Sequence, residues 1–130
     1  MQETSMHIRD YQRWVEAYDR ARGWDRVQPG QTLVHVMEEL GEIAREVLTM
    51  EGYKPGETEA ARARLAEELG DCLTLLIKLA YQYDIDVETV LETVRSKVEE
   101  RYSVEFGQQE MKRYLARQEE NLARLRGKNV

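Results

Sequence analysis

Two short acidic stretches carry the side chains of this chain that are most suited to chemistry. They read Glu38-Glu39-Leu40-Gly41-Glu42 and Glu67-Glu68-Leu69-Gly70-Asp71. Glu39 and Glu42 stand three residues apart, as do Glu68 and Asp71, and this spacing puts two side chains on one face of a helix. Carboxylates that meet from two helices can form a cage for a divalent cation. The stretches therefore predict a four-carboxylate metal site between two helices.

The competing interpretation is a solvated acidic face, because 34% of the residues are charged and glutamates on helices mostly face water. At about 100° per residue, Glu68 falls inside an apolar arc that includes Leu75 and Leu79, and Asp71 falls on its border. A buried carboxylate costs on the order of several kcal/mol unless it is paired or bound to metal. Glu39 only borders the apolar arc of its helix, so the second stretch carries the stronger evidence.

The ligand chemistry narrows the choice of metal. Cages built only from oxygen atoms suit hard ions, Mg²⁺ or Mn²⁺, whereas zinc would call for histidine or cysteine ligands. The chain has two histidines and one cysteine. The cysteine, Cys72, falls within an apolar arc, and we expect it in the core. Mg²⁺ is therefore the expected cofactor, with Mn²⁺ as a possible substitute.

Two basic residues face inward on a later helix. Arg101 falls inside the apolar arc of the helix expected over about 86–102, and Lys97 falls on the border of that arc. These cations could form salt bridges with the carboxylates, or they could bind a polyanion such as phosphate beside the metal. Geometry leaves both interpretations open.

The elements that position these side chains are all helical. Pro29-Gly30 and Pro55-Gly56 mark loops, and the apolar periodicity contains no convincing strand. We expect Asp86 to cap a helix, and the two glycines of the acidic stretches, Gly41 and Gly70, to mark points of close helix approach. Helices are predicted over about 5–22, 32–50, 58–83, 86–102 and 107–126.

The fold class that follows is all-α: a four-helix bundle-like fold with an additional C-terminal helix, in one domain spanning 1–130. A net charge of −6 argues against a nucleic-acid partner. No stretch approaches the roughly 18 apolar residues of a membrane span, so no membrane partner is expected. The first residues lack the features of a signal peptide, and one cysteine cannot form an internal disulfide. We therefore expect a cytoplasmic protein.

The two motifs and the basic helix together resemble the MazG-like, all-α nucleoside triphosphate pyrophosphohydrolase superfamily. Its signature is Glu-Glu-x-x-Glu, a variable spacer and Glu-x-x-Asp, here beginning at Glu38 and at Glu68, followed by a lysine with an arginine four residues on. The resemblance covers about 32–102. It implies hydrolysis of a (d)NTP to a (d)NMP and pyrophosphate, in house-cleaning or control of the nucleotide pool.

The resemblance also implies roles for individual residues. It makes Glu38 the candidate for activating the attacking water. The implied Mg²⁺ ligands are Glu39, Glu42, Glu68 and Asp71. The implied phosphate contacts are Lys97 and Arg101. Tyr102, which follows them, is a further implied substrate-binding residue. The family usually builds its site between chains, which implies a homodimer or homotetramer.

The base-binding residues are harder to predict. Trp24, in the loop after the first helix, could stack on a base, and His35, on the carboxylate side of its helix, could reach a substrate or remain solvated. Trp14 lies on the apolar stripe of the first helix, and we expect it in the core. Two alternatives stay open: a phosphoribosyl-ATP pyrophosphohydrolase, and a non-catalytic helical oligomerisation module whose acids pair with Lys97 and Arg101.

Overall fold

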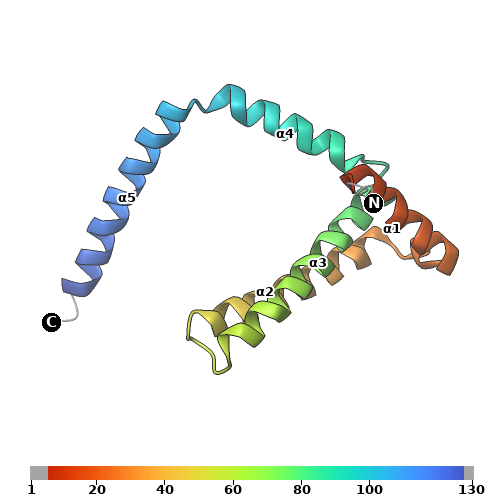
Figure 1. The fold of residues 1–130 in the computed structure, drawn as a ribbon, viewed down its shortest axis with the longest axis horizontal. Helices are drawn as coiled ribbons and strands as arrows, with labels where there is room; N and C mark the ends of the chain where they lie inside the picture. Colours follow the sequence, from red (N-terminus) through yellow and green to blue (C-terminus); the bar gives the residue numbers. More distant parts are fainter. Residues whose placement is uncertain (1–5, 128–130) are drawn as a thin grey trace, which may run out of the picture. The chain divides into compact units, whose positions relative to one another are not determined.

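The structure, a computed structural model, describes residues 6–127, and its regular secondary structure is helical throughout that range (Figure 1). No strand occurs among the described residues. In chain order the elements are α1 (Ile8–Arg22), the 3-10 helix η1 (Trp24–Arg26), α2 (Pro29–Met50), α3 (Thr58–Gln82), α4 (Val87–Arg101) and α5 (Val104–Gly127). The prediction of an all-α fold is confirmed. None of these helices combines the length and apolar composition that crossing a membrane requires.

The helix ends differ from the prediction at two places. Pro29 and Gly30 form the first turn of α2 instead of a loop, because a proline at the first helical position loses no helical hydrogen bond. The last helix begins at Val104, upstream of Gly107, where the Phe106 amide donates to the Ser103 hydroxyl at 3.1 Å and caps the helix. The predicted start of the first helix at Ser5 lies outside the described residues.

The chain divides into two compact units, one up to Val90 and one from Leu91 on, and each is described by itself. In the first unit, α2 and α3 lie side by side in opposite directions and are joined by the loop 51–57 (Figure 1). Helix α1 packs against α3, and η1 connects α1 to α2. The second unit consists of α5 and most of α4.

The core of the first unit is small. Its buried apolar side chains include Val15, Val36, Ala61, Cys72 and Tyr81, so the prediction that Cys72 is a core residue is confirmed. Several leucines of α3 are about half exposed, among them Leu69, Leu73 and Leu76. One side of the α2–α3 pair therefore keeps an apolar surface in the single chain.

The two glycines of the acidic stretches do not lie at a close helix contact. A Cβ atom placed on Gly41 or Gly70 would meet no neighbouring atom of the described chain within 4 Å. The prediction that they mark close helix approach is therefore wrong for the single chain. Both positions face open space. Glycine is less favourable than alanine inside a helix, and packing within the chain does not explain why glycine stands at these positions.

Asp86 ties the start of α4 to α1. Its Oδ2 accepts a hydrogen bond from the Thr89 amide at 3.1 Å, which confirms the predicted cap. Arg9 Nη2 donates to the same oxygen at 2.8 Å. Hydrogen bonds from Arg9 and Thr89 hold the pKa of the Asp86 carboxyl well below its usual range.

Candidate functional site

Three of the predicted carboxylates meet between α2 and α3. Glu39 of α2 and Glu68 and Asp71 of α3 each offer a carboxylate oxygen, and these oxygens lie within 4.8 Å of one another. Glu68 and Asp71 come from one helix face because they are three residues apart. The opposite direction of α2 brings Glu39 beside them. We call these three residues the carboxylate cluster.

The negative charges of the carboxylate cluster repel one another. Glu39 and Glu68 are half buried, and Glu39 Oε2 has no hydrogen-bond partner among the described residues. The pKa of the Glu68 carboxyl is raised, first by its hydrogen bond with Glu39, then by burial and by repulsion from Glu39, Asp71 and Glu46. Carboxylates that repel one another at partly buried positions are stabilised by a bound cation.

The chemistry of these donors fits a hard divalent ion. All three ligands are carboxylates, and the unpartnered Glu39 oxygen is available for coordination. Mg²⁺ and Mn²⁺ prefer such oxygen ligands, and Mg²⁺ is often held by one or two protein carboxylates together with substrate phosphates. The carboxylate cluster can therefore hold Mg²⁺ and still leave coordination positions for a phosphorylated ligand.

Two further predicted acids lie on α2 outside the carboxylate cluster. Glu42 and Glu38 are both exposed. Among the described residues, neither places a carboxylate oxygen within the group formed by Glu39, Glu68 and Asp71. Their expected roles, as a metal ligand and as the activator of a water, remain predictions.

A pocket of about 510 Å³ extends from the carboxylate cluster toward η1. Glu39 and Asp71 line one part of it, and aromatic side chains line another. The full lining is Tyr11, Trp14, Val15, Tyr18, Asp19, Trp24, His35, Glu39, Asp71, Thr74, Leu75 and Lys78. Trp24, predicted to stack on a base, and His35, expected to reach a substrate or remain solvated, both line this cavity. We call this cavity the aromatic pocket.

The aromatic wall is a continuous series of rings. Tyr11, Trp14 and Tyr18 follow one face of α1, with ring centroids 5.5 Å and 5.1 Å apart. Trp24 continues the series at 5.9 Å from Tyr18. The Trp14 side chain is 54% exposed, so the prediction that it belongs to the core is wrong. An apolar stripe at helical spacing looks the same in sequence whether it faces a core or a pocket.

Trp24 is held in place by its backbone. Gly23 ends α1 in the left-handed conformation, at φ 74°, which a glycine adopts without steric cost. The η1 turn that follows is tied to α3 twice: Lys78 Nζ donates to the Trp24 carbonyl at 3.0 Å, and Gln82 Nε2 donates to the Val27 carbonyl at 2.9 Å. The position of the Trp24 ring therefore depends on α3.

A buried polar group that sequence reasoning missed closes the pocket at this end. Lys78 Nζ forms an ion pair with Asp19 Oδ2 at 3.2 Å, and the two side chains are 13% and 8% exposed. The Tyr81 hydroxyl donates to the same Asp19 oxygen at 2.5 Å. Burial and this hydrogen bond raise the pKa of Tyr81 well above its usual value, so the phenol remains a donor. Spacing along α3 could have found Lys78, because it follows Asp71 by about two helical turns.

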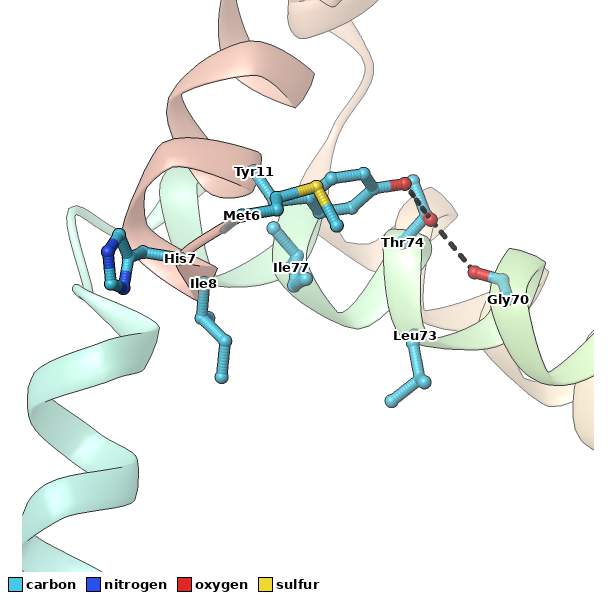
Figure 2. Close-up of a pocket in the computed structure, with 8 residues that line it drawn as sticks. All are labelled: Met6, His7, Ile8, Tyr11, Gly70, Leu73, Thr74 and Ile77. Carbon is cyan, nitrogen blue, oxygen red and sulfur yellow. Dashed lines mark hydrogen bonds between the residues drawn. The ribbon is translucent and has the colours of Figure 1, made fainter. Parts of the chain in front are cut away.

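A second cavity, of about 330 Å³, lies on the other side of Tyr11 and Thr74. Figure 2 shows the Tyr11 hydroxyl pointing at Thr74, at 2.8 Å, and the Thr74 hydroxyl pointing at the Gly70 carbonyl, also at 2.8 Å. Most of its lining is apolar, and it includes no carboxylate, lysine or arginine. The chemistry of the site is therefore on the side of the carboxylate cluster.

The predicted phosphate ligands lie in the second unit. Lys97 and Arg101 are exposed residues of α4, and Arg101 Cζ lies 5.5 Å from the ring centroid of Tyr102. Tyr102 in turn contacts Phe106, with ring centroids 5.9 Å apart. Because this unit is described by itself, their contacts with a ligand of the first unit remain predictions.

Comparison with known proteins identifies the family of this chain. The family model of the MazG nucleotide pyrophosphohydrolase domain matches residues 28–106, which include both acidic stretches and the basic helix. The chain is 32% identical over 103 residues to the uncharacterized protein YvdC of Bacillus subtilis (strain 168), a match that covers 75% of this chain and 97% of YvdC. It is 33% identical over 90 residues to the uncharacterized protein YpjD of the same organism, covering 69% and 81% of the two chains. The predicted resemblance is confirmed, and the chain belongs to the MazG nucleotide pyrophosphohydrolase family.

Proposed function

We propose that the protein is a Mg²⁺-dependent nucleoside triphosphate pyrophosphohydrolase, which converts a canonical or damaged (d)NTP and water to a (d)NMP and pyrophosphate. One observation carries this proposal: two residues of the carboxylate cluster, Glu39 and Asp71, line the same pocket as an aromatic wall. The carboxylates can hold the metal that a triphosphate requires, and the aromatic side chains can stack on a nucleobase. A role in house-cleaning or in control of the nucleotide pool fits this reaction.

The metal would be held by Glu39, Glu68 and Asp71, with Glu42 as the fourth ligand of the proposal. When bound there, Mg²⁺ offsets the charge of the triphosphate and stabilises the charge that develops on the leaving pyrophosphate. The carboxylates would serve as ligands of the metal, and none of them would attack the triphosphate.

The water and the phosphates need further side chains. We assign to Glu38 the removal of a proton from the attacking water, since a carboxylate near the cleaved bond can act as general base. Lys97 and Arg101 are assigned to the phosphates, where cationic donors form charge-assisted hydrogen bonds. Tyr102, which contacts the Arg101 guanidinium, is assigned to positioning that group.

The base would stack in the aromatic pocket. Trp14 and Trp24 are both about half exposed in this cavity, and large aromatic faces left open to a pocket favour stacking on a planar base. His35 lines the same wall, between the carboxylate cluster and Trp24. The proposal thus places the triphosphate toward Asp71 and the base toward Trp24.

The apolar surface of α2 and α3 supports a homo-oligomer, either a dimer or a tetramer. Its half-exposed residues include Leu33, Met37, Leu40, Leu69 and Leu73. Large apolar side chains gathered on one surface mark an interaction site. Light scattering of the purified protein tests this part: a mass of two or four chains supports it, and a monomer contradicts it.

The reaction is tested by incubating the protein with a panel of NTPs and dNTPs in Mg²⁺, and by following the products with ³¹P NMR. We expect pyrophosphate and a monophosphate, complete loss of turnover with EDTA, and a loss of about 100-fold or more in Glu38→Gln. Release of inorganic phosphate, or turnover that persists in EDTA, would contradict the proposal. Phosphoribosyl-ATP is included in the same panel. Faster hydrolysis of phosphoribosyl-ATP than of any NTP or dNTP would favour the alternative, a phosphoribosyl-ATP pyrophosphohydrolase.

A further inference from the structure

We infer that the end of the aromatic pocket near η1 recognises a carbonyl group of the nucleobase through Lys78 and Thr32, so that carbonyl-bearing bases are preferred over adenine. The inference rests on the proposed function, because it takes a nucleotide as the ligand of this pocket. It adds a preference among bases that the carboxylate cluster and the stacking rings do not provide.

Lys78 has one donor left for a ligand. Its ammonium carries three N–H donors, of which one is given to the Trp24 carbonyl and one to Asp19 Oδ2. The side chain is 13% exposed, so it is not a solvated surface lysine. It lines the aromatic pocket and also an adjoining cavity of about 220 Å³, and both cavities include Trp24 and His35.

Thr32 provides an independent sign of a ligand at the same place. Its side chain is 2% exposed, and its Oγ1 is buried without a hydrogen-bond partner among the described residues. Thr32 lines the adjoining cavity together with Lys78, Trp24 and His35. Buried polar atoms in native proteins nearly always have partners. The hydroxyl has almost no accessible surface, so a rotation of the Thr32 side chain toward the cavity would let a polar ligand supply the missing partner.

The hydrogen-bond donors of Lys78 and Thr32 determine which bases fit this end of the pocket. A lysine ammonium can only donate hydrogen bonds, so its complement is an acceptor, and it repels an amino group. Uracil, thymine, cytosine and guanine each carry a carbonyl oxygen, whereas the acceptors of adenine are ring nitrogens and its exocyclic group is an amino group. The Thr32 hydroxyl can donate or accept beside that carbonyl. A site that is built to pair with one polar group discriminates strongly against a ligand that lacks it.

The position of Lys78 suits the base end of a nucleotide. Asp71 and Lys78 line the same cavity from one helix, and the step of seven residues from Asp71 to Lys78 corresponds to about 10 Å along the helix axis. A triphosphate held by the carboxylate cluster therefore directs its nucleoside toward Trp24 and Lys78.

Binding of deoxynucleoside monophosphates without metal tests the inference. The chain has two tryptophans, and both line the aromatic pocket, so quenching of their fluorescence reports occupancy. We expect the best of dUMP, dTMP, dCMP and dGMP to bind about tenfold or more tightly than dAMP. Equal or tighter binding of dAMP would overturn the inference.

Two variants test whether Lys78 and Thr32 produce the preference for carbonyl-bearing bases. Lys78→Met is expected to weaken binding of the carbonyl-bearing nucleotide by about 10- to 100-fold and that of dAMP by less than about twofold. Thr32→Val removes a hydroxyl that has no partner among residues 6–127, so we expect weaker binding of the same nucleotide with no loss in melting temperature. Lys54→Met, at an exposed loop position, is the control and should bind like the original protein.

The outcomes separate a specific from a structural role. A loss by the same factor for all bases in Lys78→Met would mean that Lys78 only supports the fold, and unchanged binding in both variants would place recognition elsewhere. If the protein hydrolyses triphosphates but no monophosphate quenches the fluorescence, the inference fails and the proposed function stands. If monophosphates bind with the expected preference and no triphosphate is hydrolysed, the proposed function fails and this subsite stands.

Discussion

The two acidic stretches are almost identical in sequence, yet they contribute unequally to the site. The stretch on α3 supplies two members of the carboxylate cluster, Glu68 and Asp71, whereas the stretch on α2 supplies Glu39. Glu42 has the same spacing from Glu39 that Asp71 has from Glu68, and both are exposed, but only Asp71 places a carboxylate oxygen beside those of Glu39 and Glu68. Spacing therefore puts two acids on one helix face, while the rotation of the helix decides whether that face meets the partner helix.

The largest effect is expected from the α3 stretch. Glu68→Gln removes a central acid of the carboxylate cluster, and we expect release of pyrophosphate to fall by at least about 100-fold. Glu67→Gln changes the neighbouring, exposed acid and should keep activity within about twofold. The free energy of unfolding of Glu68→Gln should not be lower than that of the original protein, since a repelled carboxylate is removed. Equal activities of the two variants would refute the assigned site.

A smaller effect is expected from the α2 stretch, where Glu39 and Glu42 form a matched pair. We expect Glu39→Gln to weaken Mg²⁺ binding by about 10- to 100-fold and Glu42→Gln to weaken it by less, because only Glu39 lies in the carboxylate cluster of the described chain. Calorimetric titration with Mg²⁺ measures both. The reverse order would show that α2 rotates when the metal binds.

The pH dependence of metal binding tests the charge repulsion in the carboxylate cluster. The pKa of Glu68 is raised above the ordinary glutamate value of 4.5, so the folded chain holds this proton more tightly than the unfolded chain does. Without metal, stability from this group is therefore lost as the pH rises through the raised pKa. With Mg²⁺ the sign reverses, because protons compete with the metal.

This reversal is measured as melting temperature against pH, with and without Mg²⁺. We expect the stabilisation by Mg²⁺ to grow as the pH rises above 4.5, the ordinary value for glutamate. The same titration on Glu68→Gln should lose most of this dependence. A stabilisation that is independent of pH would contradict the assignment of a proton-binding carboxylate to the metal site.

The smallest effects are expected at the two glycines. Gly41→Ala and Gly70→Ala should each raise the free energy of unfolding by about 0.5–1 kcal/mol, because an added Cβ meets nothing within 4 Å in the described chain. Urea unfolding measures the change, and light scattering of the same samples follows the oligomer. Destabilisation with loss of mass would instead show that a second copy packs on these glycines.

The sequence predicted the helices and the acids of the site better than its binding pocket. The helical period and the spacing of the acids were sufficient to find Glu39, Glu68 and Asp71, because the period and the spacing are both read from the sequence of a single helix. Trp14 was misplaced because a stripe of aromatic residues has the same period on a core face and on a pocket wall. Lys78 was missed because its partners, Asp19 and the Trp24 carbonyl, are distant in sequence.

Titration with Mn²⁺ followed by electron paramagnetic resonance shows whether Glu39, Glu68 and Asp71 form one divalent-cation site. We expect saturable binding to the original protein and to Glu67→Gln, competition by Mg²⁺, and binding to Glu68→Gln that is weaker by about 100-fold or more. Undiminished Mn²⁺ binding in Glu68→Gln would contradict this site.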